Sequence, residues 1–567
     1  MRHSSFWGWI AAMLFLTALI ISLSILSTEP DRRAILNAKV LSMDADNTIH
    51  QAVLIDHGRI VAVGSNEEIS EQIDKYTEVS DVNGKVLMPG IIDAHGHYPG
   101  SGLLDLTVDL NSPPIGKTES IADIRASLSL AAKNKGDDEW LFGWGYDDTL
   151  LAERRHPNRF DLDRISTDQP IFIVHVSGHM GVANSKALAI AGISAETTQP
   201  EGGVITIDPE TGEATGLLEE NAMKPVQSIA MDLGALDFLN MLSFASNQYA
   251  QRGVTTAQSG GVDARMYAGL RWASKLGLMK QRLVVFPLFD QLGPRLLAEP
   301  EEFSAHNTDN FLVGPVKIIA DGSIQGYTGY LSEPYHVPYK GDADYRGYPR
   351  VSLEQLTLEV DRYRRRGIQL AIHGNGDASM DDIITAVDKA QRKYPDDDQR
   401  LILIHAQMAR ADQLDEFKRL GITPSFFSAH TYYWGDRHRD IFMGPKRAAN
   451  MSPARWSMDR ELTFSIHLDT PVVPMQPFLL VWSAVNRLSS SGQVVGADQR
   501  LPIMQALRAV TIDAAWQIFQ DDNRGSIEPG KWADLILLSD DPLINPAAIK
   551  DIQVLETIVG GKKVYNQ

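Results

Sequence analysis

The chain has 567 residues, of which 44% are hydrophobic and 22% charged, a balance typical of a folded globular protein with more than one structural unit. Its formal net charge of -19 predicts no nucleic-acid partner, because such binding needs Lys and Arg to neutralise phosphates. The sequence contains no cysteine, which excludes disulfides, thiolate metal sites and cysteine nucleophiles. Any metal must therefore be held by His, Asp, Glu or a modified Lys.

The first element in chain order is an apolar segment without a charge, from Phe6 to Leu26. About 20 residues at about 1.5 Å per residue span a hydrocarbon core of about 30 Å. The segment is longer than the core of a signal peptide, and Trp7 and Trp9 stand where an interfacial aromatic belt would lie. We predict that residues 1–29 form an uncleaved membrane anchor, in preference to a cleaved signal peptide or a buried helix. The catalytic body is expected outside the cytoplasm.

Short β-rich runs follow the anchor and are separated by the turn signals Asp-His-Gly and Asn-Gly. They cover residues 34–90, and residues 521–567 at the other end of the chain repeat the same pattern. We predict that these two segments form one composite β-sandwich domain.

Between them, residues 91–520 alternate short apolar strands with helical stretches, which is typical of βα units around a parallel sheet. Strand-like runs include "VKIIAD", "LAIHG" and "LILIH", and the helical run "ADQLDEFKRLG" ends in a glycine. Eight such units would close a (β/α)8 barrel of the TIM type. The alternation is irregular over about residues 101–230, which predicts an inserted subdomain over the barrel mouth.

Polar residues stand at the ends of several of these apolar runs, or inside one of them. In a parallel barrel the active site gathers at the carboxyl ends of the strands. His95 and His97 are one residue apart and would point to the same side of an extended chain. Each residue alone has an ordinary structural interpretation, such as a hydrogen-bonded histidine or an edge lysine. Together they predict a metal site made of His95, His97, Lys317, His373, His405 and Asp469.

The order His-x-His, strand Lys, His, His, Asp resembles the amidohydrolase superfamily. The segments "VLMPGIIDAHGH", "VKIIADGSIQGYTGYLSEPY" and "GSIEPGKWADLILLSDDP" are similar to its family 3, the group of YtcJ-like hydrolases and N-substituted formamide deformylases. The resemblance runs from about residue 34 to the end of the chain. It implies a metal-dependent hydrolase that cleaves a non-peptide carbon–nitrogen bond, such as an amide or N-formyl bond, in a small molecule.

The resemblance also implies roles for the polar residues. One metal would be held by His95, His97 and Asp469, and a second by His373 and His405. Lys317, carboxylated by CO2, would bridge two divalent cations that share an attacking hydroxide. Asp469 would take the proton and return it to the leaving nitrogen. Imidazole and carboxylate ligands suit zinc best, with iron, nickel and manganese left open.

The sequence departs from the family before the last ligand, where Leu468 replaces a serine and His467 either contacts substrate or packs as a structural residue. If Lys317 is unmodified, the site would hold one metal only. Aromatic and polar residues predict the substrate pocket: His179, Trp434, Tyr327 and Trp144.

Two alternatives are a single-metal deaminase of a heterocycle and a catalytically silent, membrane-anchored binding module. The lack of a His-x-x-Glu arrangement in "HGNGDAS" counts against the first, and the intact ligand set counts against the second. A homo-oligomer is left open.

Overall fold

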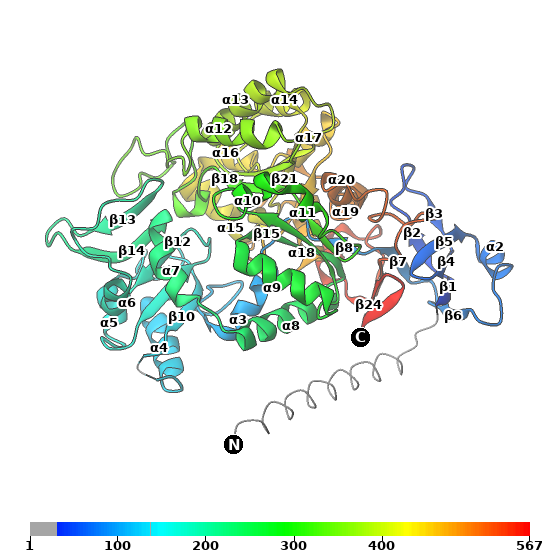
Figure 1. Ribbon diagram of the computed structural model, residues 1–567, viewed down its shortest axis with the longest axis horizontal. Helices are drawn as coiled ribbons and strands as arrows, with labels where there is room; N and C mark the ends of the chain where they lie inside the picture. Colours follow the sequence, from blue (N-terminus) through cyan, green and yellow to red (C-terminus); the bar gives the residue numbers. More distant parts are fainter. Residues whose placement is uncertain (1–30, 137) are drawn as a thin grey trace.

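The computed structural model of the protein describes residues 31–136 and 138–567 (Figure 1). The predicted anchor at residues 1–29 lies outside the described residues. Among the described helices, no single one is long and apolar enough to cross a membrane, while the pair Asn221–Ala230 and Ala235–Gln251 meets that test together but is bent by 107°. Figure 1 shows a central α/β region between two sheets on one side and a separate lobe on the other.

Two β-sheets are formed by the ends of the chain, and the second one combines strands from both ends. One has the strand order β5-β4-β1-β6, and the other has the order β25-β24-β23-β7-β2-β3. The strands are β1 (Arg32–Leu36), β2 (Lys39–Leu41), β3 (Ile49–His50), β4 (Ala52–Asp56), β5 (Arg59–Gly64), β6 (Glu78–Asp81), β7 (Val86–Pro89), β23 (Leu535–Leu538), β24 (Val554–Val559) and β25 (Lys562–Asn566), with α2 (Asn66–Ser70) after β5. The two ends meet where β23 pairs antiparallel with β7, Leu535 opposite Pro89.

The turn signals of this region lie at tight turns. His57 and Gly58, with φ of 48° and 78°, connect β4 to β5, and Asn83 and Gly84, with φ of 51° and 76°, follow β6. Successive positive φ values favour Asn and Gly and suit the twist of two paired strands. Gly58 is also required for space, because a Cβ there would lie 2.6 Å from the carbonyl oxygen of Gly560.

The central region contains two parallel sheets, which pair as β17-β16-β15-β8 and β18-β19-β20-β21-β22. Their strands are β8 (Ile91–Ile92), β15 (Val254–Val262), β16 (Arg282–Pro287), β17 (Phe311–Val313), β18 (Val316–Ile319), β19 (Leu370–Gly374), β20 (Leu401–His405), β21 (Ile422–Phe426) and β22 (Ser465–Ile466). The described strands therefore pair as two sheets and not as one closed ladder. A parallel bridge from Leu288 to Lys317 joins the sheets at one seam.

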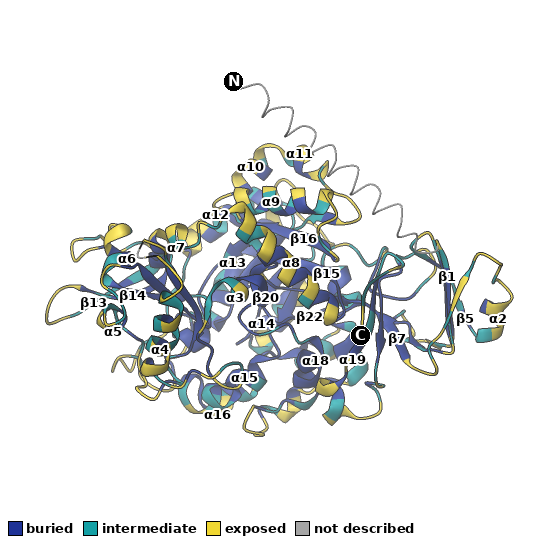
Figure 2. Ribbon diagram, turned by 90° about the horizontal axis from the view of Figure 1, so that it is seen from below, coloured by how far each residue is buried: buried dark blue, intermediate teal, exposed yellow. Residues whose placement is uncertain are grey.

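Helices cover these sheets and leave the strands buried, as the dark blue strands and the yellow and teal patches on the outer helices of Figure 2 show. The longer ones are α8 (Ala235–Gln251), α9 (Ala264–Lys275), α12 (Leu353–Arg364), α13 (Asp377–Lys393), α14 (Ala411–Leu420) and α18 (Pro477–Asn486). Short helices include α15 (His430–Arg437), α16 (Gly444–Ala449), α17 (Ala454–Asp459), α19 (Ile503–Arg508) and α20 (Ile512–Gln517). α14 ends at Gly421, whose φ of 66° is left-handed, so the glycine stops the helix as its sequence predicts.

The separate lobe in Figure 1 is a mixed six-stranded sheet of order β13-β14-β12-β11-β10-β9. It comprises β9 (Val108–Asp109), β10 (Leu141–Tyr146), β11 (Ile171–His175), β12 (Met180–Ala183), β13 (Gly203–Ile207) and β14 (Ala214–Glu220), with α4 (Ile121–Ala132), α5 (Arg159–Asp163) and α6 (Ser185–Ile190). These strands lie within the segment of irregular alternation, residues 101–230. Its β10 and β11 run parallel.

Candidate functional site

The predicted metal ligands come from different strands but share one cavity of about 890 Å³. His95 follows β8, Asp469 follows β22, and His405 is the last residue of β20. His373 lies in β19 and Lys317 in β18, one on each of two strands that pair in parallel. The carboxyl ends of β8, β19, β20 and β22 therefore bring together residues that are far apart in the sequence, and Lys317 joins them from within β18.

Asp469 lies at the centre of this group. Its Oδ1 is 3.1 Å from Nε2 of His97 and 3.4 Å from Nε2 of His95, and its Oδ2 is 3.9 Å from Nε2 of His405. Lys317 Nζ lies 3.4 Å from Nε2 of His95. Ligand-type atoms of His95, His405 and Asp469 all lie within 4.8 Å of one another, and we call these three residues the strand-end cluster.

Unpartnered atoms in the cluster fit a bound cation. Asp469 Oδ1 is buried and has no hydrogen-bond donor in suitable geometry, although imidazole nitrogens of His95 and His97 face it. Since buried polar atoms nearly always have partners, such an unpartnered carboxylate oxygen is what a metal ion would satisfy. Imidazole and carboxylate donors are a suitable set for a divalent transition metal.

The electrostatics favour the ligating protonation states. Burial, helped by neighbouring cationic groups, holds the pKa of His95, His373 and His405 well below the usual value, so these rings are neutral at neutral pH. Burial raises the pKa of Asp469, but the nearby His97, together with the other histidines, outweighs it and keeps this pKa well below its usual range. Burial lowers the pKa of Lys317 to about 7. Metal ligation needs neutral imidazole and ionised carboxylate.

The backbone is strained at two of the ligands. His405 has a φ of 74° and Asp469 a φ of 57°, in the left-handed region that non-glycine residues seldom occupy. Such strain costs about 1–3 kcal/mol per residue and is found mainly at functional sites. The fold therefore places these two side chains at the cost of local backbone stability.

Each buried histidine ligand has a polar partner behind it. His95 Nδ1 lies 2.9 Å from Oε1 of Gln258, His373 Nδ1 lies 3.2 Å from Oδ1 of Asp321, and His405 Nδ1 lies 3.1 Å from Nε2 of a further histidine, His467. Partners of this kind orient the ring and set its tautomer.

Sequence reasoning missed two of these partners, Gln258 and Asp321. The sequence contains an indication of both residues. Gln258 follows the strand-like run "VTTA" and Asp321 follows "VKIIA", as the predicted ligands follow similar runs. Asp321 accepts hydrogen bonds from the backbone N–H groups of Asn375, Gly376 and Tyr330, at 2.8 to 3.0 Å. Burial nevertheless raises its pKa to about 7.

The residues predicted to bind substrate lie in two places. His179 and Trp144 line the cavity, and the His179 ring centroid is 5.4 Å from that of His373. Trp434 and Tyr327 are not among the residues that line it. Trp434 is buried and donates Nε1–H to Asp147 at 3.2 Å, while Tyr327 is in an aromatic cluster, stacked at 4.5 Å on Tyr339.

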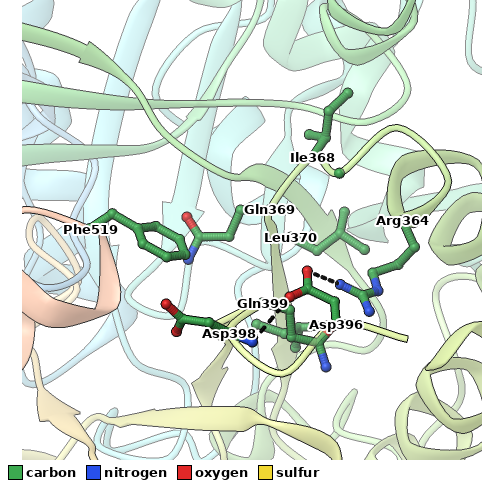
Figure 3. Close-up of a pocket in the computed structure, with 10 residues that line it drawn as sticks. Arg364, Ile368, Gln369, Leu370, Asp396, Asp398, Gln399 and Phe519 are labelled. Carbon is green, nitrogen blue, oxygen red and sulfur yellow. Dashed lines mark hydrogen bonds and ion pairs between the residues drawn. The ribbon is translucent and has the colours of Figure 1, made fainter. Parts of the chain in front are cut away.

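A much smaller cavity, of about 60 Å³, lies at the opposite end of the same strands (Figure 3). Leu370 and Leu401, which line it, are the first residues of β19 and β20. Arg364 donates a hydrogen bond to Asp396 at 3.1 Å at its edge. The cavity that holds the ligands is thus at the carboxyl ends of the strands, where parallel α/β folds place active sites.

The fold and the ligand cluster define a metal-dependent α/β hydrolase. The chain belongs to the Amidohydrolase family, whose sequence profile matches residues 78–565. It is similar to an N-substituted formamide deformylase from Arthrobacter pascens, with 29% identity over 94% of this chain and 98% of that protein. It is also similar to the amidohydrolase YtcJ of Bacillus subtilis (strain 168), with 28% identity over 91% of this chain and 96% of the relative.

A crystal structure of an uncharacterized metal-dependent hydrolase from Pyrococcus horikoshii OT3 superposes with a TM-score of 0.71. It is 24% identical and covers 91% of this chain and 99% of the other, which shows an amidohydrolase-type α/β fold. The predicted family is confirmed. The protein is an enzyme that hydrolyses non-peptide carbon–nitrogen bonds with a metal, and neither the deaminase nor the silent binding module is favoured.

Proposed function

We propose that this enzyme cleaves the amide or N-formyl bond of a small N-acyl amine at the strand-end cluster. The observation that carries the proposal is the convergence on Asp469 of three imidazole nitrogens from two strand ends, with its Oδ1 left without a hydrogen-bond donor. The deformylase of Arthrobacter pascens, similar over nearly its whole length, supports the choice of bond.

Two divalent cations, zinc by preference, would occupy the site. His95, His97 and Asp469 would hold one cation, and His373 and His405 would hold the other. Lys317 would bridge them as a carbamate, which forms only from a neutral amine, and a pKa of about 7 leaves much of this amine neutral. When bound, the cations would lower the pKa of water and polarise the substrate carbonyl.

The side chains supply the proton transfers. Asp469 is ionised and faces the histidines that would hold a cation, so it would accept a proton from an attacking water and deliver it to the leaving nitrogen. His179 pairs through Nδ1 with Oε2 of Glu220 at 2.9 Å, which leaves its Nε2 available to the substrate. Arg350 Nη1 lies 3.4 Å from the same Glu220 oxygen and holds that carboxylate in place.

The finer architecture belongs to the same proposal. The two parallel sheets would be arcs of one (β/α)8 barrel, supported by backbone hydrogen bonds between the segments that follow β8 and β22, from His97 to Thr470 and from Asp469 to His95. Residues 1–29 would anchor the enzyme in a membrane with its body outside the cytoplasm. The support for this anchor is the uncharged apolar run from Phe6 to Leu26.

The test is a hydrolysis screen of the full chain in detergent, with zinc and bicarbonate supplied. A panel of N-formyl and N-acyl amines, cyclic amides and carbamates is incubated with the enzyme, and the released amine is measured. We expect turnover of one or more N-formyl or N-acyl amines. The proposal fails if metal-loaded protein releases amine from none of them, or if an Asp469→Asn variant releases it at the wild-type rate.

A further inference from the structure

The cavity extends from the metal ligands to a wall made of α7 (Lys224–Ala230), α8 and α9. The partly exposed apolar side chains on this wall are Met231, Leu233, Phe238 and Met266. Met231 packs on the core of the mixed-sheet lobe, while Phe238 and Met266 pack on the main core. All four side chains line the cavity, and we call them the apolar wall.

The charged residues near the apolar wall already have partners. Lys224 Nζ lies 3.4 Å from Oδ2 of Asp290, and Arg265 forms an ion pair with Asp232. Asp263 caps α9 by accepting a hydrogen bond from the backbone N–H of Met266 at 2.7 Å. A charged substituent on the substrate would find no free countercharge among these residues, whereas an apolar substituent would be desolvated against four side chains.

The size of the cavity also favours a substrate with a large substituent. About 890 Å³ is near the upper end of the range of about 300–1,000 Å³ typical of small-molecule sites, far more than a formyl group and two cations need. Methionine side chains are flexible and adapt to ligands of different shape. Gly269 helps to keep this space, because a Cβ there would lie 3.1 Å from Cζ of Phe238 and press it inward or aside.

We infer that the substrate carries a bulky apolar group, an alkyl chain or an aryl ring, next to the scissile carbon–nitrogen bond. This group binds against the apolar wall while the carbonyl group lies at the metal ligands. The inference rests on the proposed function, because that function places bond cleavage at the strand-end cluster.

The test uses two matched series on the full-length enzyme loaded with zinc. Binding of n-alkylamines from ethyl to octyl is measured by calorimetry, and hydrolysis of the corresponding N-formyl-n-alkylamines is measured as kcat/KM. Burial of each methylene should raise both the affinity and kcat/KM about threefold to fourfold until the wall is covered. A charge placed in the wall, by Met266→Asp, should reduce the octyl-to-ethyl ratio, and Met266→Leu should preserve it.

The control is Leu236→Asp, which introduces the same charge on the outer face of α8, where the side chain is 70% exposed. It should leave the octyl-to-ethyl ratio unchanged. Amine affinity independent of chain length, or a ratio unaltered by Met266→Asp, would overturn the inference. Amine binding that grows with chain length, without turnover of any formamide, would support the apolar wall and count against the proposed reaction.

A second inference rests on different contacts, a buried chain of hydrogen bonds behind His405. At its far end, Gln517 Nε2 donates to Oγ1 of Thr423 at 2.8 Å and to the carbonyl oxygen of Pro424 at 2.9 Å. Because a carbonyl oxygen only accepts, the amide nitrogen must face this side. Gln517 Oε1 must then accept from the hydroxyl of Ser465, which lies 2.5 Å away.

This choice determines the direction of every bond nearer the metal ligands. Ser465 has only one hydrogen, so Ser425, 2.8 Å away, must donate to it. Ser425 then accepts from Nδ1–H of His467 at 2.9 Å, which makes Nε2 of the neutral His467 ring an acceptor. His405 Nδ1–H donates to that Nε2 at 3.1 Å, and His405 Nε2 keeps its lone pair on the side of Asp469.

We propose that His467 is a positioning residue that holds His405 in the tautomer able to ligate a metal through Nε2. The test compares His467→Leu, which removes the acceptor, with His467→Gln, which retains both an acceptor and a donor. Zinc affinity is measured by competition with a chelator, and the unfolding midpoint of each metal-free protein checks folding. We expect about 10- to 100-fold weaker zinc binding for His467→Leu and near wild-type binding for His467→Gln. Equal zinc affinity of the two variants would contradict this role.

Discussion

The strand-end cluster of His95, His405 and Asp469 and a second group in the mixed-sheet lobe, Asp147, Asp148 and His175, each hold three ligand-type atoms within 4.8 Å of one another. We call the second group the lobe cluster. Both follow parallel strands, since Asp147 comes directly after β10 and His175 ends β11. The two groups differ in whether their lone pairs are already taken by other side chains.

In the lobe cluster, Asp147 is neutralised by the protein itself. Its Oδ2 pairs with the guanidinium of Arg437 and accepts a hydrogen bond from Nε1–H of Trp434 at 3.2 Å. Its Oδ1 accepts a hydrogen bond from the hydroxyl of Thr149 at 2.6 Å. These contacts tie the lobe to α15, and the arginine supplies the positive charge that a metal would otherwise supply.

The histidine of the lobe cluster is oriented by the backbone and faces Asp148. His175 Nδ1 accepts a hydrogen bond from the backbone N–H of Ser177 at 3.2 Å, so in the neutral ring the proton is on Nε2, which faces Asp148 at 3.3 Å. His156 Nε2 lies 3.5 Å from the other oxygen of Asp148. The two clusters therefore differ at Asp147, whose carboxylate is neutralised by Arg437, and not in how closely histidine and aspartate approach each other.

The largest expected effect comes from Asp469→Asn in the strand-end cluster. We expect kcat/KM for the best substrate of the screen to fall about 100- to 10,000-fold, because the variant loses the general acid–base group. The matched change in the lobe cluster, Asp148→Asn, should alter kcat/KM by less than about threefold. A large loss of activity in Asp148→Asn without unfolding would remove the distinction between the clusters.

The next effect concerns bound metal. His405→Gln should lower the zinc content of the purified protein, since it replaces an imidazole ligand with an amide, whereas His175→Gln should leave the zinc content unchanged. Elemental analysis after dialysis against zinc and then metal-free buffer measures both variants. Zinc lost from the His175→Gln protein would show that the lobe cluster binds metal.

A smaller effect is expected on stability. Asp147→Ala leaves the largely covered guanidinium of Arg437 without its partner, and breaking a buried pair costs about 3–5 kcal/mol of unfolding free energy. The double variant Asp147→Ala/Arg437→Met should recover part of this loss. Urea unfolding measures the three proteins, and a loss below about 1 kcal/mol for Asp147→Ala would mean that the pair does not hold the lobe in place.

The smallest effect is a pH dependence. Burial raises the pKa of Asp148, but His156 and His175 outweigh it, so the folded pKa lies below the unfolded value. Its contribution to stability is therefore present above the unfolded pKa, about 3.9, and is lost as the pH falls through the folded value. As the pH falls from about 5, the unfolding free energy should decrease more steeply for wild type than for Asp148→Asn. Parallel curves would show that this carboxylate is not stabilised by the two histidines.

Local features of the chain could be predicted from the sequence. A left-handed glycine ends α14 at Gly421, and the turns at His57–Gly58 and Asn83–Gly84 follow from residues that tolerate positive φ. The family was also predictable from the order and spacing of the polar residues. Most of the residues named as ligands lie together because the carboxyl ends of parallel strands gather on one side of the fold, a rule that needs only the position of each strand.

The sequence by itself determined which residues end strands and where the turns are tight. Both features depend on the types of a few neighbouring side chains. The tertiary structure decided which strand-end groups are left with free lone pairs. Asp147 pairs with Arg437, 290 residues away, whereas Oδ1 of Asp469 has no hydrogen-bond donor among the described residues, a difference that no local pattern records. The same holds for Trp434, which contacts Asp147 and not the cavity, because the packing of distant elements alone determines the partner of a buried polar group.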